Sequence, residues 1–243
     1  MKKILLIVIT VIFTVLLFNS CQKEQTDKPA IGKQDISASA KTGSIPAEVV
    51  PLLPDLTIDA ARLASSAVVK TAVFKSTDCA VIESCVTGTG KRKLLRFDVA
   101  TPNIGTADLI LGDPTTNPKD VNGNPIFEYS PCHKHYHFSG YALYELLNAS
   151  GETILTGRKQ AFCLEDFAKY YSNPGPAKFT CSYQGITVGW QDVYGSYLDC
   201  QWLDITGIAP GNYRLRVSIN PEKLLKESDY SNNVANVAVK ISK

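Results

Sequence analysis

The chain has 243 residues, with 25 basic and 23 acidic side chains, three histidines and seven cysteines. A content of 44% apolar and 9% aromatic residues is enough for a packed core, which excludes a wholly disordered protein. The formal net charge of +2 is close to zero and gives no strongly basic surface, so a nucleic-acid partner is not expected. The length allows one large all-β domain or two small domains.

The N-terminus has the pattern of an export signal. Lys2 and Lys3 precede an apolar run over residues 4–18, which is short for a membrane span, and Cys21 follows soon after. We therefore expect residues 1–20 to be a lipoprotein signal peptide, with the lipid on Cys21. Ordinary cleavage and an uncleaved anchor are the alternatives. The protein would then lie on a bacterial cell envelope, at the periplasmic or the surface face of the outer membrane, held only by its lipid.

After the signal, the amino-acid composition of the chain changes near residue 51. Residues 21–50 are polar and small, without an aromatic side chain, and we expect a disordered tether. In residues 51–243, short runs of β-branched and aromatic residues alternate with Gly, Pro, Asn and Asp, and none shows a long helical period. This pattern predicts one all-β domain, a β-sandwich with long loops at 112–124 and 172–175. The expected strands are 94–99, 106–111, 137–147, 152–158, 213–219 and 234–241.

Residues 148–151 (Asn-Ala-Ser-Gly) predict a hairpin loop between two of these strands. If the loop has four residues, Leu147 faces Glu152. Lys159 then lies opposite Gly140, within three residues of His137, but on the other face of the sheet from His137, unless a bulge or a bend intervenes.

Six cysteines remain after Cys21, and exported thiols oxidise, so the count predicts three disulfides. They are Cys79, Cys85, Cys132, Cys163, Cys181 and Cys200. The residues alone leave the pairing open. A structural zinc site is the alternative, but no two cysteines have the C-x₂-C spacing typical of such sites.

All three histidines lie in one pentapeptide, His133-Lys134-His135-Tyr136-His137. In an extended segment alternate side chains point to one face, and a twist or kink would let the three imidazoles converge on one ion. Imidazole suits copper, zinc, nickel and iron, of which copper binds most tightly in the usual order. The alternative is a solvated polar strand face, but chance would rarely put every histidine at alternate positions. The spacing predicts a metal site without choosing between copper and zinc.

The segment from Cys132 to His137 resembles the copper-binding motif of the lysyl oxidase family, and the resemblance extends over residues 51–241. The other matching segments, in chain order, are 54–56, 94–97, 103–108, 158–166, 192–195, 199–206, 210–213, 220–221 and 227–233.

This resemblance implies a copper ion held by His133, His135 and His137, and a lysine tyrosylquinone cofactor made from Lys159 and Tyr194. It implies oxidation of primary amines, including lysine side chains of peptides or proteins, to aldehydes. O₂ would be the oxidant, and hydrogen peroxide and ammonia the other products. The residue types suit this chemistry, because copper and O₂ can oxidise a phenol and a neighbouring amine can add to the oxidised ring.

A base must also remove a proton from the substrate carbon. Asp192 is the first candidate, because it shares a strand face with Tyr194. Glu165, Asp166 and Asp199 lie in matching motifs as well, although acidic residues near turns are usually solvated or capping.

Four side chains with oxygen ligands lie close together before the last expected strand, which suits Ca²⁺. They are Glu227, Asp229, Asn232 and Asn233. The resemblance implies a structural calcium site here, completed by Asp55 and the backbone of Leu56, that joins the first and last segments of the domain. The alternative is a polar turn stabilised by Asx-type hydrogen bonds.

The resemblance also implies how the cysteines pair. The pairs are Cys79–Cys132, Cys85–Cys200 and Cys163–Cys181. The first would fix the residue beside His133 and brace the metal site. An additional pair of the animal members lacks both partners here, which leaves no orphan thiol.

A second function class stays open, a non-catalytic, metal-binding adhesion or binding module on the cell envelope. Residues 211–233 resemble bacterial β-sandwich modules of that kind, but such a module would not account for the three histidines. The bacterial type of signal argues against collagen or elastin as the physiological substrate, and we expect a monomer.

Overall fold

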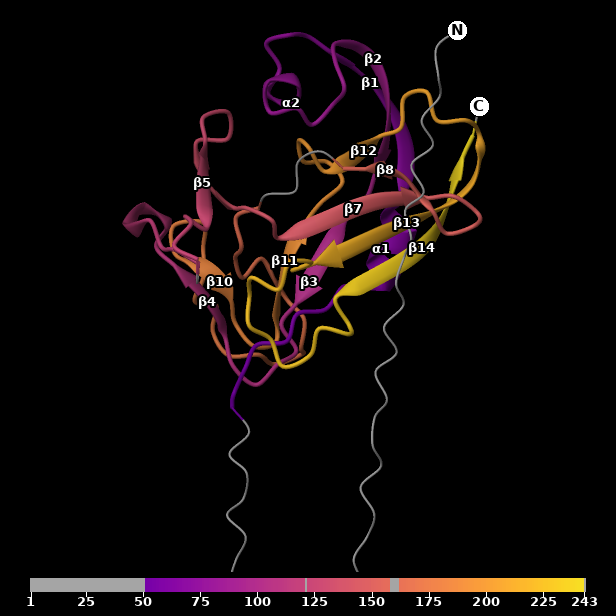
Figure 1. The fold of residues 1–243 in the computed structure, drawn as a ribbon. Coiled ribbons are helices and arrows are strands. Elements are labelled where there is room, and N and C mark those ends of the chain that lie inside the picture. Colours follow the sequence, from indigo (N-terminus) through magenta and orange to yellow (C-terminus); the bar gives the residue numbers. More distant parts are fainter. Residues whose placement is uncertain (1–50, 121, 158–161, 243) are drawn as a thin grey trace, which may run out of the picture. The chain divides into compact units, whose positions relative to one another are not determined.

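The computed structural model describes residues 51–120, 122–157 and 162–242, and strands predominate in them (Figure 1). The helical elements are α1 (Ala60–Ser66), α2 (Cys79–Ile82) and the 3-10 helix η1 (Pro114–Thr116). The strands are β1 (Val68–Phe74), β2 (Gly90–Arg96), β3 (Val99–Pro102), β4 (Leu109–Gly112), β5 (Phe127–Ser130), β6 (His135–Phe138), β7 (Ala142–Leu147), β8 (Thr153–Thr156), β9 (Ala168–Lys169), β10 (Gln184–Ile186), β11 (Trp190–Tyr194), β12 (Trp202–Asp204), β13 (Gly211–Ile219) and β14 (Val234–Ile241). The expectation of an all-β domain is confirmed.

The largest sheet has four antiparallel strands in the order β14-β13-β7-β8, and Figure 1 shows β7, β13 and β14 side by side. Along β14 exposed and buried residues alternate without a break, as a strand with one face on the core requires. Its buried face consists of Ala235, Val237, Val239 and Ile241.

A second layer covers that face. It contains the sheets β1-β2-β12 and β3-β11-β9. Leu215 of β13 belongs to the same buried cluster as Leu95 of β2 and Leu203 of β12. Phe97 and Tyr144 meet edge to face between the layers, with ring centroids 5.0 Å apart. The two layers therefore form a sandwich around one main core. Each large apolar side chain buried in this core contributes about 1.5–3 kcal/mol to stability.

Three of the strand expectations need correction, and the first is the run 94–99, which is divided between β2 and β3. The run 137–147 is not one strand, because the chain turns at Gly140, where φ is +75°, and this turn separates β6 from β7. The loop at 148–151 does join β7 to β8, but Leu147 pairs with Thr153 rather than Glu152. The Asn148 side chain accepts the N–H of Glu152 at 2.9 Å, which holds Glu152 in the turn and shifts the register beside Leu147.

Several earlier expectations lie outside the described residues. These are the signal peptide at 1–20, Cys21, the tether at 21–50, and Lys159. In the part of the chain that the structure describes, no helix is long and apolar enough to span a membrane.

Candidate functional site

A cavity of about 330 Å³ opens beside β6 and the end of β11. Its walls come from three distant segments of the chain. They are His133, His135, His137, Phe162, Tyr194, Tyr197, Leu198, Asp199 and Cys200. The three histidines and the tyrosine that the sequence singles out therefore lie around one space.

The histidines converge because the chain kinks between them. His135 and His137 lie on β6 and point to one face, whereas His133 lies in the preceding turn, where Lys134 has a φ of +60°. The His133 ring centroid is 6.0 Å from that of His135 and 5.5 Å from that of His137. The Nε2 atoms of His135 and His137 are 2.9 Å apart, about the separation of adjacent ligand atoms on one ion with bonds of about 2.0 Å. The donor set fits a copper or zinc ion.

Two disulfides fix the walls of this cavity. Cys132, next to His133, is bonded to Cys79 at the start of α2, with the Cα atoms 5.6 Å apart. Cys200, in the cavity wall, is bonded to Cys85 just after α2, with the Cα atoms 5.2 Å apart. Together with the third bond, Cys163–Cys181, they are the pairs that the resemblance implies.

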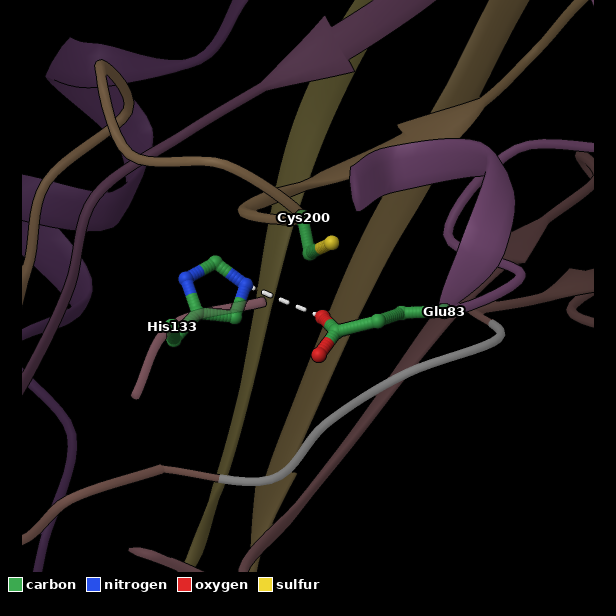
Figure 2. A group of neighbouring side chains, drawn as sticks. All are labelled: Glu83, His133 and Cys200. Carbon is green, nitrogen blue, oxygen red and sulfur yellow. Dashed lines mark hydrogen bonds and ion pairs between the residues drawn. The ribbon is translucent and has the colours of Figure 1, made fainter. Parts of the chain in front are cut away.

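Glu83 is a site residue that sequence reasoning missed. It follows α2, and its Oε2 lies 2.9 Å from Nε2 of His133, as Figure 2 shows. Cys200 completes this group, but its sulfur is committed to the disulfide with Cys85. One signal could have found Glu83. It lies between two cysteines whose implied partners flank the site.

Tyr194 is the last residue of β11, where it pairs with Val99 of β3. Its ring packs against Phe162 with centroids 4.1 Å apart, and its hydroxyl donates to the carbonyl oxygen of Cys163 at 2.6 Å. Burial, followed by the negative charge of Asp192, raises the pKa of the Tyr194 phenol well above its ordinary value. The phenol is therefore neutral and held in one orientation at the cavity wall.

The next residue explains part of the Asp-x-Tyr-Gly motif. A Cβ at Gly195 would lie 2.2 Å from the Cε1 atom of the Tyr197 ring. Glycine lets that ring, which is largely exposed, fold back over the chain and line the cavity.

Asp192 shares β11 with Tyr194 but does not line the cavity. It is 2% exposed. Its Oδ1 accepts the N–H of Val193 at 2.8 Å, and its Oδ2 has no hydrogen-bond partner among the described residues. Burial raises the pKa of this carboxyl well above its usual range. A buried acid with a raised pKa beside a candidate site is itself a candidate for a functional residue.

The other acidic candidates separate into different roles. Asp166 accepts hydrogen bonds from Lys178 and Thr187 and so closes its own loop. Glu165 is half-buried, and burial, with the charge of Asp166, raises its pKa. Asp199 is exposed in the wall of the cavity. Only Asp199 of these three lines the space beside the histidines.

The expected calcium ligands gather where the two ends of the domain meet. Glu227 accepts the backbone N–H of Leu56 at 2.6 Å and the amide of Asn233 at 2.8 Å, and Asn232 donates to Asp55 at 2.8 Å. The side-chain oxygens of Asn232 and Asn233 are buried without a partner among the described residues. These oxygens fit a cation, which would satisfy them. One expected ligand stands apart. The exposed carboxylate of Asp229 accepts from Ser231 in an Asx-type turn.

Comparison with known proteins places the chain in a family. A family model described as lysyl oxidase matches residues 54–243. Protein-lysine 6-oxidase of Homo sapiens is 37% identical over 193 residues, which cover 75% of this chain and 44% of that protein. Protein-lysine 6-oxidase of Sus scrofa is 36% identical over 199 residues, covering 77% and 76%, and lysyl oxidase homolog 1 of Homo sapiens is 37% identical over 193 residues, covering 75% and 32%. The chain thus spans less than half the length of these human relatives. It belongs to the lysyl oxidase family.

Proposed function

We propose that the protein is a copper-dependent amine oxidase that converts primary amines, including lysine side chains of peptides or proteins, to aldehydes, with release of hydrogen peroxide and ammonia. The observation that carries this proposal is a cavity lined both by the three converging histidines and by Tyr194. His133, His135 and His137 would hold the copper, and Tyr194 with Lys159 would provide a lysine tyrosylquinone. When present, this pair of groups supplies the oxidising equivalents for the amine and returns them to O₂.

The protein's own residues then bind the substrate and handle its proton. The exposed carboxylate of Asp199 attracts the ammonium group of the substrate to the cavity. Phe162 and the carbonyl of Cys163 keep the Tyr194 ring in one orientation. Asp192 lies on the same strand but does not line the cavity, so of the candidate bases Asp199 is the one that can reach the proton of the substrate carbon.

Peptide mass mapping of the copper-loaded protein tests the proposal. After aerobic loading we expect a cross-link between the Lys159 and Tyr194 peptides, and peroxide on addition of a primary amine. Tyr194→Phe should abolish both, whereas Tyr183→Phe, at an exposed tyrosine outside the cavity wall, should keep both. Unmodified Lys159 and Tyr194 peptides, together with no peroxide from any amine, would refute the oxidase function and favour the non-catalytic binding module.

We also propose a structural calcium ion bound by Asp55, Glu227, Asn232 and Asn233 with the backbone of Leu56. The support is the pair of buried amide oxygens that have no partner among the described residues and lie next to two carboxylates. Hard oxygen donors from both ends of the domain suit Ca²⁺ better than a soft metal. Isothermal titration of chelator-treated protein with Ca²⁺ should give about one equivalent, and a flat titration would refute the site.

We propose in addition that the mature protein begins at a lipidated Cys21 after removal of residues 1–20, and is anchored to the cell envelope. The basic and apolar pattern before Cys21 supports this. The intact mass of protein extracted from membranes should exceed that of the unlipidated chain, and Cys21→Ser should release soluble protein. An unshifted mass would contradict the anchor.

A further inference from the structure

Oε2 of Glu83 lies beside Nε2 of His133, as Figure 2 shows. The distance between Oε2 of Glu83 and Nε2 of His133 is 2.9 Å, the same as that between the Nε2 atoms of His135 and His137. Both distances are about the spacing of two ligand atoms at right angles to each other on one ion, with bonds of about 2.0–2.1 Å. A carboxylate oxygen at this distance from a ligand nitrogen can bind the same ion as that nitrogen.

The surroundings hold Glu83 in this place. Its Oε1 accepts the hydroxyl of Ser130, and the same hydroxyl accepts the backbone N–H of His133 at 3.0 Å. The Glu83 side chain is 10% exposed and that of His133 is 24% exposed, so water competes weakly for either. The disulfides of Cys79 and Cys85 fasten the segment on both sides. One carboxylate oxygen thus accepts from Ser130, and the other contacts Nε2 of His133.

Charge gives a reason for a carboxylate at this point. Three neutral imidazoles leave the full double charge of Cu²⁺ in a partly buried cavity, and an anionic oxygen ligand halves it. Hard carboxylate oxygen favours the divalent ion over Cu⁺, which softer ligands prefer.

We propose that Oε2 of Glu83 is a fourth protein ligand of the copper ion, beside the three histidines. This inference rests on the proposed function, since it presumes that the histidines hold copper. Glu83→Gln, with a neutral side chain of the same shape, then lowers the affinity for Cu²⁺ by at least about tenfold and changes the copper electron paramagnetic resonance spectrum.

The test uses the full chain loaded with Cu²⁺ alone, with affinity measured by competition against a chromophoric chelator. Glu128→Gln is the matched control, because Glu128 is an exposed carboxylate paired with His137 across β5 and β6. Ser130→Ala removes the scaffold contact but keeps the carboxylate. Glu128→Gln should retain the wild-type spectrum, whereas Glu83→Gln should not, and Ser130→Ala should change the spectrum less than Glu83→Gln does. A merely structural role of Glu83 would change the spectrum of Glu83→Gln no more than that of Ser130→Ala.

A measurement on the wild type covers the case in which Glu83→Gln does not fold. With ¹³C in the glutamate carboxyl groups, electron-nuclear double resonance should detect a strong ¹³C coupling to Cu²⁺. Absence of that coupling, or an unchanged spectrum in Glu83→Gln, overturns the role of Glu83 while the copper site of the histidines stands. A wild-type chain that binds no Cu²⁺ overturns the proposed function itself.

Discussion

Replacing Glu227 by glutamine perturbs the contact that joins the two ends of the domain. Glu227 is 4% exposed, and one of its oxygens accepts the N–H of Leu56 at 2.6 Å. The other accepts the amides of Asn220 at 2.6 Å and Asn233 at 2.8 Å. Glutamine has one accepting oxygen, so its NH₂ group must face the N–H of Leu56. A buried donor without a partner costs about 1–3 kcal/mol, and the loss of charge from the other two bonds adds about 1 kcal/mol. We expect the free energy of unfolding to fall by about 2–4 kcal/mol without calcium.

Calcium should enlarge this effect if Glu227 is a ligand. A cation at a hundred times its dissociation constant stabilises the folded state by about 2.7 kcal/mol, and the neutral variant loses most of that. The loss measured by urea unfolding should therefore be larger in calcium than in chelator by about 2 kcal/mol. Glu222→Gln, at an exposed position nearby, is the control and should change stability by less than about 0.5 kcal/mol. Equal losses with and without calcium refute calcium binding by Glu227, and a loss under about 0.5 kcal/mol in chelator refutes the hydrogen-bond reasoning.

Two further substitutions address the rest of the domain. Because burial raises the pKa of Asp192 in the folded state, wild-type stability should fall as the pH rises from about 4 through that pKa. Asp192→Asn stays neutral, so it should gain stability relative to the wild type over this window, and parallel urea-unfolding curves from pH 4 to 9 would contradict the raised pKa. Replacing Cys85 and Cys200 by serine opens a loop of sequence separation 115 and should cost about 5 kcal/mol, against about 3 kcal/mol for Cys163 and Cys181, whose separation is 18. The reverse order of the urea midpoints would argue against loop entropy as the main cause.

The parts of the fold that sequence could predict are those with a local signal. The alternation in residues 234–241 predicts β14 to the residue, because one face of that strand is buried and the other is solvated. The three histidines could be found from their spacing alone. The spacing also indicates that a kink or twist is needed for them to converge, but not that the kink lies at Lys134. The disulfide pairs came from the resemblance, since spacing does not determine pairing.

The parts that sequence could not predict depend on contacts between distant segments. Helix α1 has seven residues, too few for a helical period, although Asp59 caps it by accepting the N–H of Arg62. Strand β1 has a mixed burial pattern because only part of it meets the core. Glu83 looks like a solvated charge until the disulfides bring it to His133. The burial of Asp192, which sets its pKa, is equally a property of the packed layers.

The turns in the cavity wall explain why two disulfides lie beside the candidate metal site. The sandwich core is stabilised by apolar packing between sheets, but the cavity wall runs through turns, from His133 in one turn to Cys200 in another. Turn segments lack the ladder of backbone hydrogen bonds that holds a strand in place. The disulfides of Cys132 and Cys200 supply that constraint covalently, and both lead to the short segment around α2. The segment bearing Glu83 is thus a common anchor for two walls of the cavity. Reduction should therefore loosen the metal site before the main core of the sandwich opens, because Cys85 and Cys200 pack in a separate, smaller cluster with Phe74 and Trp202.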